Sequence, residues 1–319
     1  MMQALKISEL AKTFPLAKPL FGKAPPGVRA VRPMSFAVEK GETLGIVGES
    51  GCGKSTLARM LVGLLEPTKG QIEIAGKALD TADPAAFGRL IQYVFQDPIS
   101  SLNPRKTIRQ IMEVPLKRLH GLDKPARDKR TREIFASVNL REEFLDRYPH
   151  EFSGGQAQRI GIARALAASP EIMVLDEPVS ALDVSVQAQV LNLLAELKAQ
   201  FNLTYLFISH DLAVVEAVSD RVVVLYFGSV VEIGRAEDIF KSPKHPYTKL
   251  LAESAPVVGR ALTAPEQKDS ELPDPLNPPP GCAFAGRCVH ATELCRTEEP
   301  RLRPMGEDQL AACHHPLEG

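Results

Sequence analysis

The chain has no excess of either charge and no long apolar run, and both absences exclude functions. Lys and Arg number 38 against 39 Asp and Glu, so the net charge is −1. A chain this close to neutrality has no overall basic field with which to hold nucleic acid. No apolar segment approaches the ~20 residues that cross a bilayer as a helix. We therefore expect any role at a membrane to come through a partner.

Cysteine is scarce and unevenly placed. Cys52 stands alone, whereas the other four cysteines, Cys282, Cys288, Cys295 and Cys313, lie close together near the end of the sequence. The opening residues, MMQALKISEL, lack the apolar run of a signal peptide. We therefore expect a cytosolic protein, and a reducing cytosol favours metal or cluster ligation over disulfides.

Strand-length apolar segments alternate with helical segments along most of the chain. We expect strands within 4–10, 34–48 (two strands around a turn at Gly41), 69–76, 90–96, 171–176, 203–209, 221–227 and 229–234. We expect helices at 54–64, 107–119, 124–138, 184–200 and 211–218, and a loop over the proline-rich residues 15–33. Apolar strands between helices predict an α/β fold with a largely parallel sheet covered on both faces.

The segment GIVGESGCGKST contains a phosphate-binding loop, since it follows an apolar strand and opens a helix. Its glycines let several backbone N–H groups point at phosphate, Lys54 can reach the β- and γ-phosphates, and the Ser55 hydroxyl can bind Mg²⁺. Cys52 is either made reactive by the helix N-terminus or simply fills a tolerated position. The predicted nucleotide-binding residues of this loop are Gly48, Glu49, Ser50, Gly51, Cys52, Gly53, Lys54, Ser55 and Thr56.

Two further apolar strands end in polar residues suited to hydrolysis. The strand EIMVLD ends at Asp176, which can hold the water shell of a metal ion, and Glu177 follows it and can polarise the attacking water. A second strand, LTYLFIS, ends just before His210, and ligands bind at the carboxyl ends of such strands. We expect these residues to lie near the γ-phosphate.

The stretch FSGGQAQRIGIARAL begins a second helix that is suited to anion binding. One interpretation is a helix cap at Ser153, with glycines for close packing. The other is a half-site, in which Ser153, Gly154, Gly155 and Gln156 serve a nucleotide held on a neighbouring subunit. Spacing alone leaves both open.

The phosphate-binding loop, Gln96, FSGGQ, VLDEP, SALD and His210 together resemble the ATP-binding-cassette ATPases over about residues 1–250. This resemblance implies a RecA-like mixed sheet with an N-terminal antiparallel part, a helical subdomain over about 97–168, and a head-to-tail dimer that encloses ATP. It implies that Glu177 is the general base and His210 the γ-phosphate sensor. It further implies that Gln96 contacts Mg²⁺ and the attacking water and that Phe14 stacks on adenine.

Longer segments, such as FQDPISSLNPRKTI and HPYTKLLAESAP, are similar to the dipeptide and oligopeptide importer ATPases. Within that family, FSGGQ and EPVSALDVS are similar to the F-type subunit. That subunit works beside a D-type ATPase, two transmembrane permease subunits and an extracytoplasmic peptide-binding protein. Two residues depart from the wider pattern: Phe152 stands where Leu is usual, and Ala157 where a basic residue is usual.

Residues 251–319 are expected to form a C-terminal module that contains a proline-rich linker and the four clustered cysteines. The cysteine spacing, C-x5-C-x6-C-x17-C, fits zinc fingers poorly. Four thiolates also suit a [4Fe–4S] cluster, which the resemblance implies, while Zn²⁺ and no metal remain alternatives. A metal staple would suit a segment with little apolar core.

The resemblance therefore implies an ATPase at the cytoplasmic face of the inner membrane that energises import of di- or oligopeptides, or of a related solute such as a nickel chelate. A soluble ATPase acting on DNA or ribosomes would be expected to carry a coiled-coil insertion, tandem cassettes or basic arms, and none is visible. A non-hydrolysing regulatory subunit would be expected to lack Glu177 or His210, and both are present.

Overall fold

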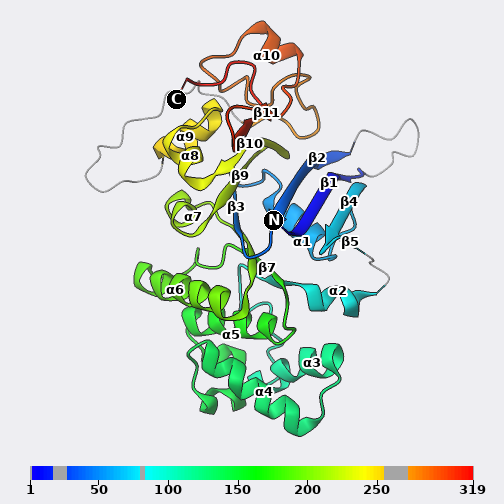
Figure 1. Cartoon of the computed structure of the whole chain (residues 1–319), viewed down its shortest axis with the longest axis vertical. Helices are drawn as coiled ribbons and strands as arrows, with labels where there is room; N and C mark the ends of the chain where they lie inside the picture. Colours follow the sequence, from blue (N-terminus) through cyan, green and yellow to red (C-terminus); the bar gives the residue numbers. More distant parts are fainter. Residues whose placement is uncertain (1, 17–26, 80–82, 255–271, 319) are drawn as a thin grey trace.

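The computed structural model describes residues 2–16, 27–79, 83–254 and 272–318. Part of the predicted loop over 15–33 and most of the predicted linker therefore lie outside the described residues. Two β-sheets form the centre of the molecule (Figure 1). The first is antiparallel, in the order β2-β1-β4-β5, and its strands are β1 Gln3–Phe14, β2 Val28–Glu39, β4 Lys69–Ile74 and β5 Lys77–Ala78.

The second sheet has the order β11-β12-β10-β9-β3-β8-β7-β6. Its strands are β3 Thr43–Val47, β6 Ile91–Val94, β7 Ile172–Asp176, β8 Thr204–Ile208, β9 Arg221–Tyr226, β10 Ser229–Arg235, β11 Arg303–Pro304 and β12 Leu310–Ala311. Strands β6, β7, β8, β3 and β9 pair in parallel, and β9, β10, β12 and β11 pair antiparallel. The predicted fold class, a mixed sheet with an antiparallel part near the N-terminus, is confirmed.

Helices cover both faces of the second sheet, which explains the uniformly apolar sequence of its central strands. Every residue of β3, β7 and β8 is buried. Successive side chains of β7 pack into different cores: Ile172 and Val174 belong to one apolar cluster, and Met173 and Leu175 to the other. This alternation is the period of a strand with both faces buried.

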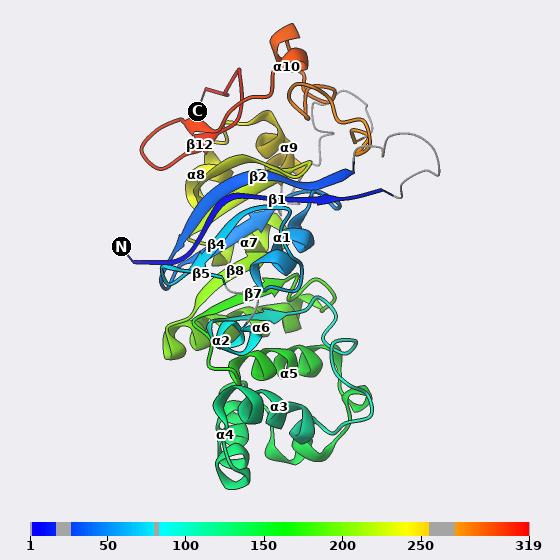
Figure 2. The same ribbon diagram turned by 90° about the vertical axis from the view of Figure 1, so that its right-hand side faces the viewer.

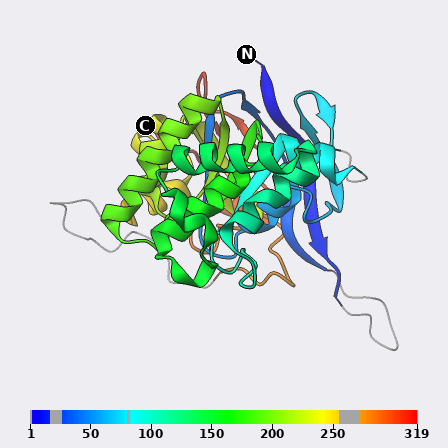
Figure 3. The ribbon, with the colours of Figure 1, turned by 90° about the horizontal axis from the view of Figure 1, so that it is seen from below.

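The helices are α1 Lys54–Leu61, α2 Pro84–Leu90, α3 Ile108–His120, α4 Lys124–Ser137, α5 Gly154–Leu166, α6 Val184–Phe201, α7 Leu212–Val218, α8 Ala236–Lys241, α9 Pro246–Ser254 and α10 Glu293–Thr297, with short 3₁₀ helices η1 Glu142–Asp146 and η2 Pro149–Glu151. Helices α3, α4 and α5 form one end of the molecule, and α10 lies at the other (Figures 1 and 2). Seen from below, the green helices cover the sheet (Figure 3). Among the described residues no helix is both long and apolar enough to span a membrane.

The prediction of a loop over 15–33 is wrong for its second half, because β2 already begins at Val28. Phe14 pairs with Val28 and Lys12 with Val31, so β1 and β2 form a long hairpin. The proline that argued for a loop, Pro33, lies where the register between Leu10 and Lys12 shifts. Strands tolerate proline at such irregularities, since no ladder bond is lost there.

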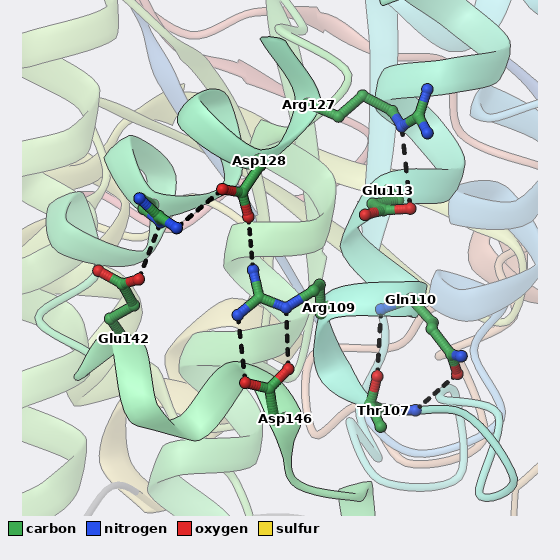
Figure 4. A network of polar contacts seen from close by, with 9 residues as sticks. Thr107, Arg109, Gln110, Glu113, Arg127, Asp128, Glu142 and Asp146 are labelled. Carbon is green, nitrogen blue, oxygen red and sulfur yellow. Dashed lines mark hydrogen bonds and ion pairs between the residues drawn. The ribbon is translucent and has the colours of Figure 1, made fainter. Parts of the chain in front are cut away.

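Surface ion pairs join the helices of the end formed by α3 and α4 (Figure 4). Arg109 of α3 donates to both carboxylate oxygens of Asp146, at 2.8 and 3.2 Å, and to Asp128 of α4, at 2.6 Å. Thr107 caps α3 and forms a reciprocal capping box with Gln110. One arginine thus links α3, α4 and η1, whose packed faces are apolar.

Candidate active site

The phosphate-binding loop connects β3, which ends at Val47, to α1, which begins at Lys54. A Cβ atom at Gly48 would lie 2.2 Å from the carbonyl oxygen of Leu225, and one at Gly53 would lie 2.4 Å from that of Ala30. Gly53 also has a φ of 102°, which disfavours any other residue. The loop therefore packs its backbone directly against neighbouring strands.

Lys54 lies inside this loop, with only 7% of its surface exposed. Its ammonium group donates to the carbonyl oxygens of Gly48, at 2.6 Å, and Glu49, at 3.0 Å. Ser55 and Thr56 follow in the first turn of α1. The arrangement places a positive charge, a hydroxyl group and a helix N-terminus together, and these are the groups that bind a nucleoside triphosphate.

Cys52 belongs to the apolar core rather than to an exposed reactive site. It is 5% exposed and lies in the same cluster as Leu57 and Leu61. Burial raises the pKa of its thiol. A buried thiol of raised pKa is inert, so the structure favours the prediction that Cys52 fills a tolerated position.

The carboxylate of Asp176 is buried at the end of β7, with 4% of the residue exposed. The Tyr93 hydroxyl donates to Oδ2, and burial together with this bond raises the pKa of Tyr93, so it remains a donor. The other oxygen, Oδ1, has no hydrogen-bond partner among the described residues. A buried carboxylate oxygen without a protein donor fits a role toward Mg²⁺ or its water shell, for which Ser55 offers a second oxygen.

Three predicted catalytic side chains meet at Glu177. Its Oε2 accepts a hydrogen bond from Gln96 Nε2 at 3.0 Å, and its Oε1 lies 3.1 Å from His210 Nδ1. The Glu177 backbone has a φ of 47°, and its N–H donates to Ile208 at the end of β8. This turn directs the carboxylate toward the residues that follow β6 and β8, so one acid is oriented by two neighbours.

The FSGGQ segment lies at the start of α5, among the helices at the end of the molecule opposite α10 (Figure 1). Ser153 caps α5 by accepting from the Gln156 N–H at 3.4 Å, and Gln156 Oε1 accepts from the Ser153 N–H at 3.1 Å. A Cβ atom at Gly155 would lie 2.5 Å from Val186 of α6, and one at Gly154 would lie 3.3 Å from Leu182. Capping and close packing are therefore both present within the chain, and a contact with nucleotide stays a prediction.

Phe14, the predicted adenine-stacking residue, ends β1 with 39% of its surface exposed. The ammonium group of Lys12 lies 5.4 Å from the centroid of its ring. The ring is thus accessible for stacking, which remains a prediction.

Sequence reasoning missed two residues that contact the phosphate-binding loop from the C-terminal part of the chain. The N–H of Glu49 donates to the hydroxyl of Tyr247 at 2.9 Å, and its carboxylate accepts two bonds from Arg287, at 2.8 and 2.9 Å. Tyr247 belongs to the HPYT segment, whose resemblance to importer ATPases was the one available signal. No signal in the sequence pointed to Arg287.

The four clustered cysteines lie around one small cavity. That cavity is lined by Cys282, Cys288, Cys295, Cys313, His245, Pro246, Ala285, His290, His314 and His315. Burial, reinforced by the neighbouring cysteines, raises the pKa of Cys282 and of Cys313 to about 11. Within the described ranges, no three or more His, Cys, Asp or Glu residues are arranged to hold a metal ion.

Comparison with known proteins agrees with this geometry. The family described as "ABC transporter" matches residues 31–180, and "Oligopeptide/dipeptide transporter, C-terminal region" matches residues 231–295. The chain is 49% identical to the dipeptide transport ATP-binding protein DppF of Haemophilus influenzae, over 96% of this chain and 94% of that protein. It is 46% identical to the oligopeptide transport ATP-binding protein AppF of Bacillus subtilis, over 97% and 96%.

Solved structures with the same fold include cbiO1 from Clostridium perfringens, at a TM-score of 0.66 and 26% identity over 76% of this chain and 92% of that one. Another is the cassette MJ0796, bound to ADP and phosphate in a dimeric post-hydrolysis state, at a TM-score of 0.65 and 29% identity over 73% and 98%. The phosphate-binding loop, the paired acids at the end of β7 and these likenesses agree. The chain therefore belongs to the ABC transporter ATPases, among the members that carry the oligopeptide/dipeptide transporter C-terminal region.

Proposed function

We propose that this chain is the ATP-hydrolysing subunit that drives import of di- or oligopeptides across a membrane. The observation that carries the hydrolytic part is the Glu177 carboxylate, held between Gln96 and His210 beside the end of β7. A carboxylate in this position can take a proton from the attacking water while Lys54 and Mg²⁺ hold the phosphates. The peptide part rests on relatives such as DppF and AppF, which match nearly the whole chain.

The subunit would act within an assembly. A D-type ATPase would complete the nucleotide sites, two permease subunits would receive the motion through the region from Gln96 to Arg105, and an extracytoplasmic binding protein would deliver peptide. The ATPase would then lie at the cytoplasmic face of the inner membrane. ATP can drive closure only to the extent that it binds the closed state more tightly than the open one.

Reconstitution in proteoliposomes with two permease subunits and a D-type ATPase of a peptide importer tests this proposal. We expect ATP hydrolysis to rise when binding protein loaded with a dipeptide or an oligopeptide is added, and to stay at background for the Glu177→Gln assembly. Stimulation by a nickel chelate and by neither peptide class would favour the related-solute alternative. No stimulation by any solute would contradict an importer role.

The FSGGQ segment would contribute Ser153, Gly154, Gly155 and Gln156 to the nucleotide of the neighbouring subunit. Its support is that Ser153 and Gly154 are exposed at the N-terminus of α5, where an anion is favoured. In a Glu177→Gln background, this subunit should associate with the D-type ATPase when ATP is present, as size-exclusion chromatography can show. Replacing Ser153 with Arg should abolish that association. Ser254→Arg, at the exposed end of α9, is the matched control, and unchanged association of Ser153→Arg would contradict the composite site.

The four cysteines around the cavity would hold a [4Fe–4S] cluster. Four thiolates are the usual ligands of such a cluster, and the support for this proposal is that the four cysteines line one cavity. When bound, the cluster would staple a segment that has few large apolar side chains.

Anaerobic purification with iron, sulfide and zinc quantified distinguishes the candidates. About four irons and four sulfides per chain, with broad visible absorbance, are expected for the cluster. One zinc and no sulfide would contradict it and leave the ATPase assignment unchanged.

A further inference from the structure

Glu49, the second residue of the phosphate-binding loop, has all of its polar groups engaged. Its carbonyl oxygen accepts from Lys54, its N–H donates to Tyr247, and both carboxylate oxygens accept from Arg287. Paired bonds from one guanidinium to one carboxylate fix orientation as well as distance. Two of these three partners come from the C-terminal part of the chain, about 200 or more positions away.

Both C-terminal partners are rigidly placed. Tyr247 is fully buried, and the centroid of its ring lies 4.5 Å from that of the Tyr226 ring and 5.5 Å from that of the Phe284 ring. The guanidinium of Arg287 lies over the Tyr226 and Phe284 rings, at 5.9 and 5.6 Å from their centroids. Only 12% of the Arg287 side chain is exposed. The aromatic cluster of Tyr226, Tyr247 and Phe284 thus supports both contacts to Glu49.

The same two residues adjoin the cysteine-lined cavity. Arg287 lies in the short segment between Cys282 and Cys288, and the N–H groups of Arg287 and Cys288 both donate to Phe284. Tyr247 follows His245, which lines the cavity and whose Nδ1 accepts from the Tyr247 N–H at 3.0 Å. Two separate sets of contacts, one through Arg287 and one through Tyr247, therefore connect the lining of the cavity to Glu49 in the ATP site.

We infer that Arg287 and Tyr247 are positioning residues of the ATP site, which hold the start of the phosphate-binding loop through Glu49. The loop binds phosphate through backbone N–H groups, so its affinity depends on how well its conformation is fixed before binding. Coupling of this kind is reciprocal. The contacts of Arg287 and Tyr247 with Glu49 favour nucleotide binding, and bound nucleotide stabilises the C-terminal segment. The inference rests on ATP binding, and neither on the transported solute nor on what the cysteines hold.

Direct binding of a fluorescent ATP analogue to the full chain tests this role. We expect Arg287→Gln and Glu49→Gln each to raise Kd about tenfold, the factor that corresponds to 1.4 kcal/mol. The double variant should bind no more weakly than either single variant, because the two residues act through one contact. Arg287→Lys retains the charge but loses the paired bonds, so its Kd should lie between those of the parent and Arg287→Gln.

Two further variants keep the test independent of folding. Tyr247→Phe removes a single hydroxyl from a buried ring and should also raise Kd. Glu299→Gln breaks the 2.6 Å ion pair with Arg32, which also joins the C-terminal segment to the core without touching the loop, and should leave Kd unchanged. Parental Kd values in Arg287→Lys and Tyr247→Phe would overturn the inference, as would additive losses in the double variant or a loss in Glu299→Gln equal to that in Arg287→Gln.

Discussion

The Glu177 side chain shows how one residue can be oriented from two sides. Gln96 donates to one carboxylate oxygen and His210 approaches the other, while only 17% of the side chain is exposed. A carboxylate held this way has little freedom to rotate, so it can accept a proton along a fixed direction. The Glu177 backbone has a left-handed φ of 47°, a conformation that costs free energy in a residue other than glycine and that directs the carboxylate toward Gln96 and His210.

Glu177→Gln should bind ATP as the parent does but hydrolyse it about 10²–10⁴-fold more slowly, because the amide cannot accept the proton of the attacking water. Phosphate release and equilibrium nucleotide binding, measured on the same preparation, separate the two effects. Glu171→Gln, an exposed glutamate just before β7, is the matched control. Retained turnover in Glu177→Gln would exclude Glu177 as the general base.

Residues whose role depends on a short local motif could be predicted from the sequence. The phosphate-binding loop and Asp176–Glu177 each follow one strand, and a strand's end places them at one edge of the sheet. The contact between Glu49 and Arg287 could not be predicted, because 238 positions separate the two residues. Such a pair depends on how the aromatic cluster packs, which no local pattern encodes.

At the scale of elements, α5 and α6 approach so closely that a glycine is required between them. Gly155→Ala should destabilise the chain by about 1–3 kcal/mol, because the added methyl group would lie 2.5 Å from Val186. Gly154→Ala, whose methyl group would lie 3.3 Å from the flexible Leu182 side chain, is the milder comparison. Chemical denaturation measures both.

Equal stability of these two alanine variants would contradict the packing explanation. It would leave the backbone conformation of the segment, or its contact with nucleotide, as the reason for the glycines.

The ion pairs of Figure 4 predict a pH dependence for the helices α3 and α4. The Arg109 guanidinium holds the pKa of Asp146 below its ordinary value of 3.8. The pair therefore stabilises the folded state above about pH 4, and this contribution is lost as the pH falls through the lower, folded-state pKa. Because Asp146 is largely exposed, the contribution should not exceed about 1 kcal/mol.

Urea unfolding of the parent and of Asp146→Asn, compared from pH 6 downward, measures this contribution. We expect the difference between them to shrink as the pH falls below 4, and also in 1 M salt, which screens exposed charges. A difference that stays constant with pH would exclude the carboxylate as its source.

The helical segments 107–119 and 124–138 are predicted nearly to the residue. Thr107 and Asp123 cap them, and apolar residues recur at helical spacing in the first of the two. The hairpin of β1 and β2 was predicted poorly. Its prolines suggested a loop, but strand pairing across Phe14 and Val28 prevails over that local preference.

At the scale of the whole molecule, the C-terminal segment is joined to the ATPase core by both a sheet and a cluster of rings. β12 pairs with β10, and Phe284, 3% exposed, packs on Tyr226 and Tyr247. The prediction of a module over 251–319 described its cysteines but not this attachment. β12 has only two residues, too few to show the alternating pattern of a strand, so its pairing with β10 could not be predicted from the sequence.

Phe284→Ala should lower the free energy of unfolding by about 3–5 kcal/mol, because it leaves a cavity among buried rings. Phe284→Leu, which retains most of the volume, should cost clearly less. Thermal and chemical unfolding of the full chain measure both, and equal costs would contradict the packing of Phe284 among the rings of Tyr226 and Tyr247.

The antiparallel pairing of β12 with β10 also has a consequence for biosynthesis. Residues 310–311, which cover the outer edge of β10, are translated well after that strand, which ends at Arg235. Until they arrive, the nascent chain displays an open strand edge, the kind of surface on which foreign strands pair. Premature termination upstream of β12 would leave that edge open for good, so we expect such truncated products to be strong clients of chaperones and proteases.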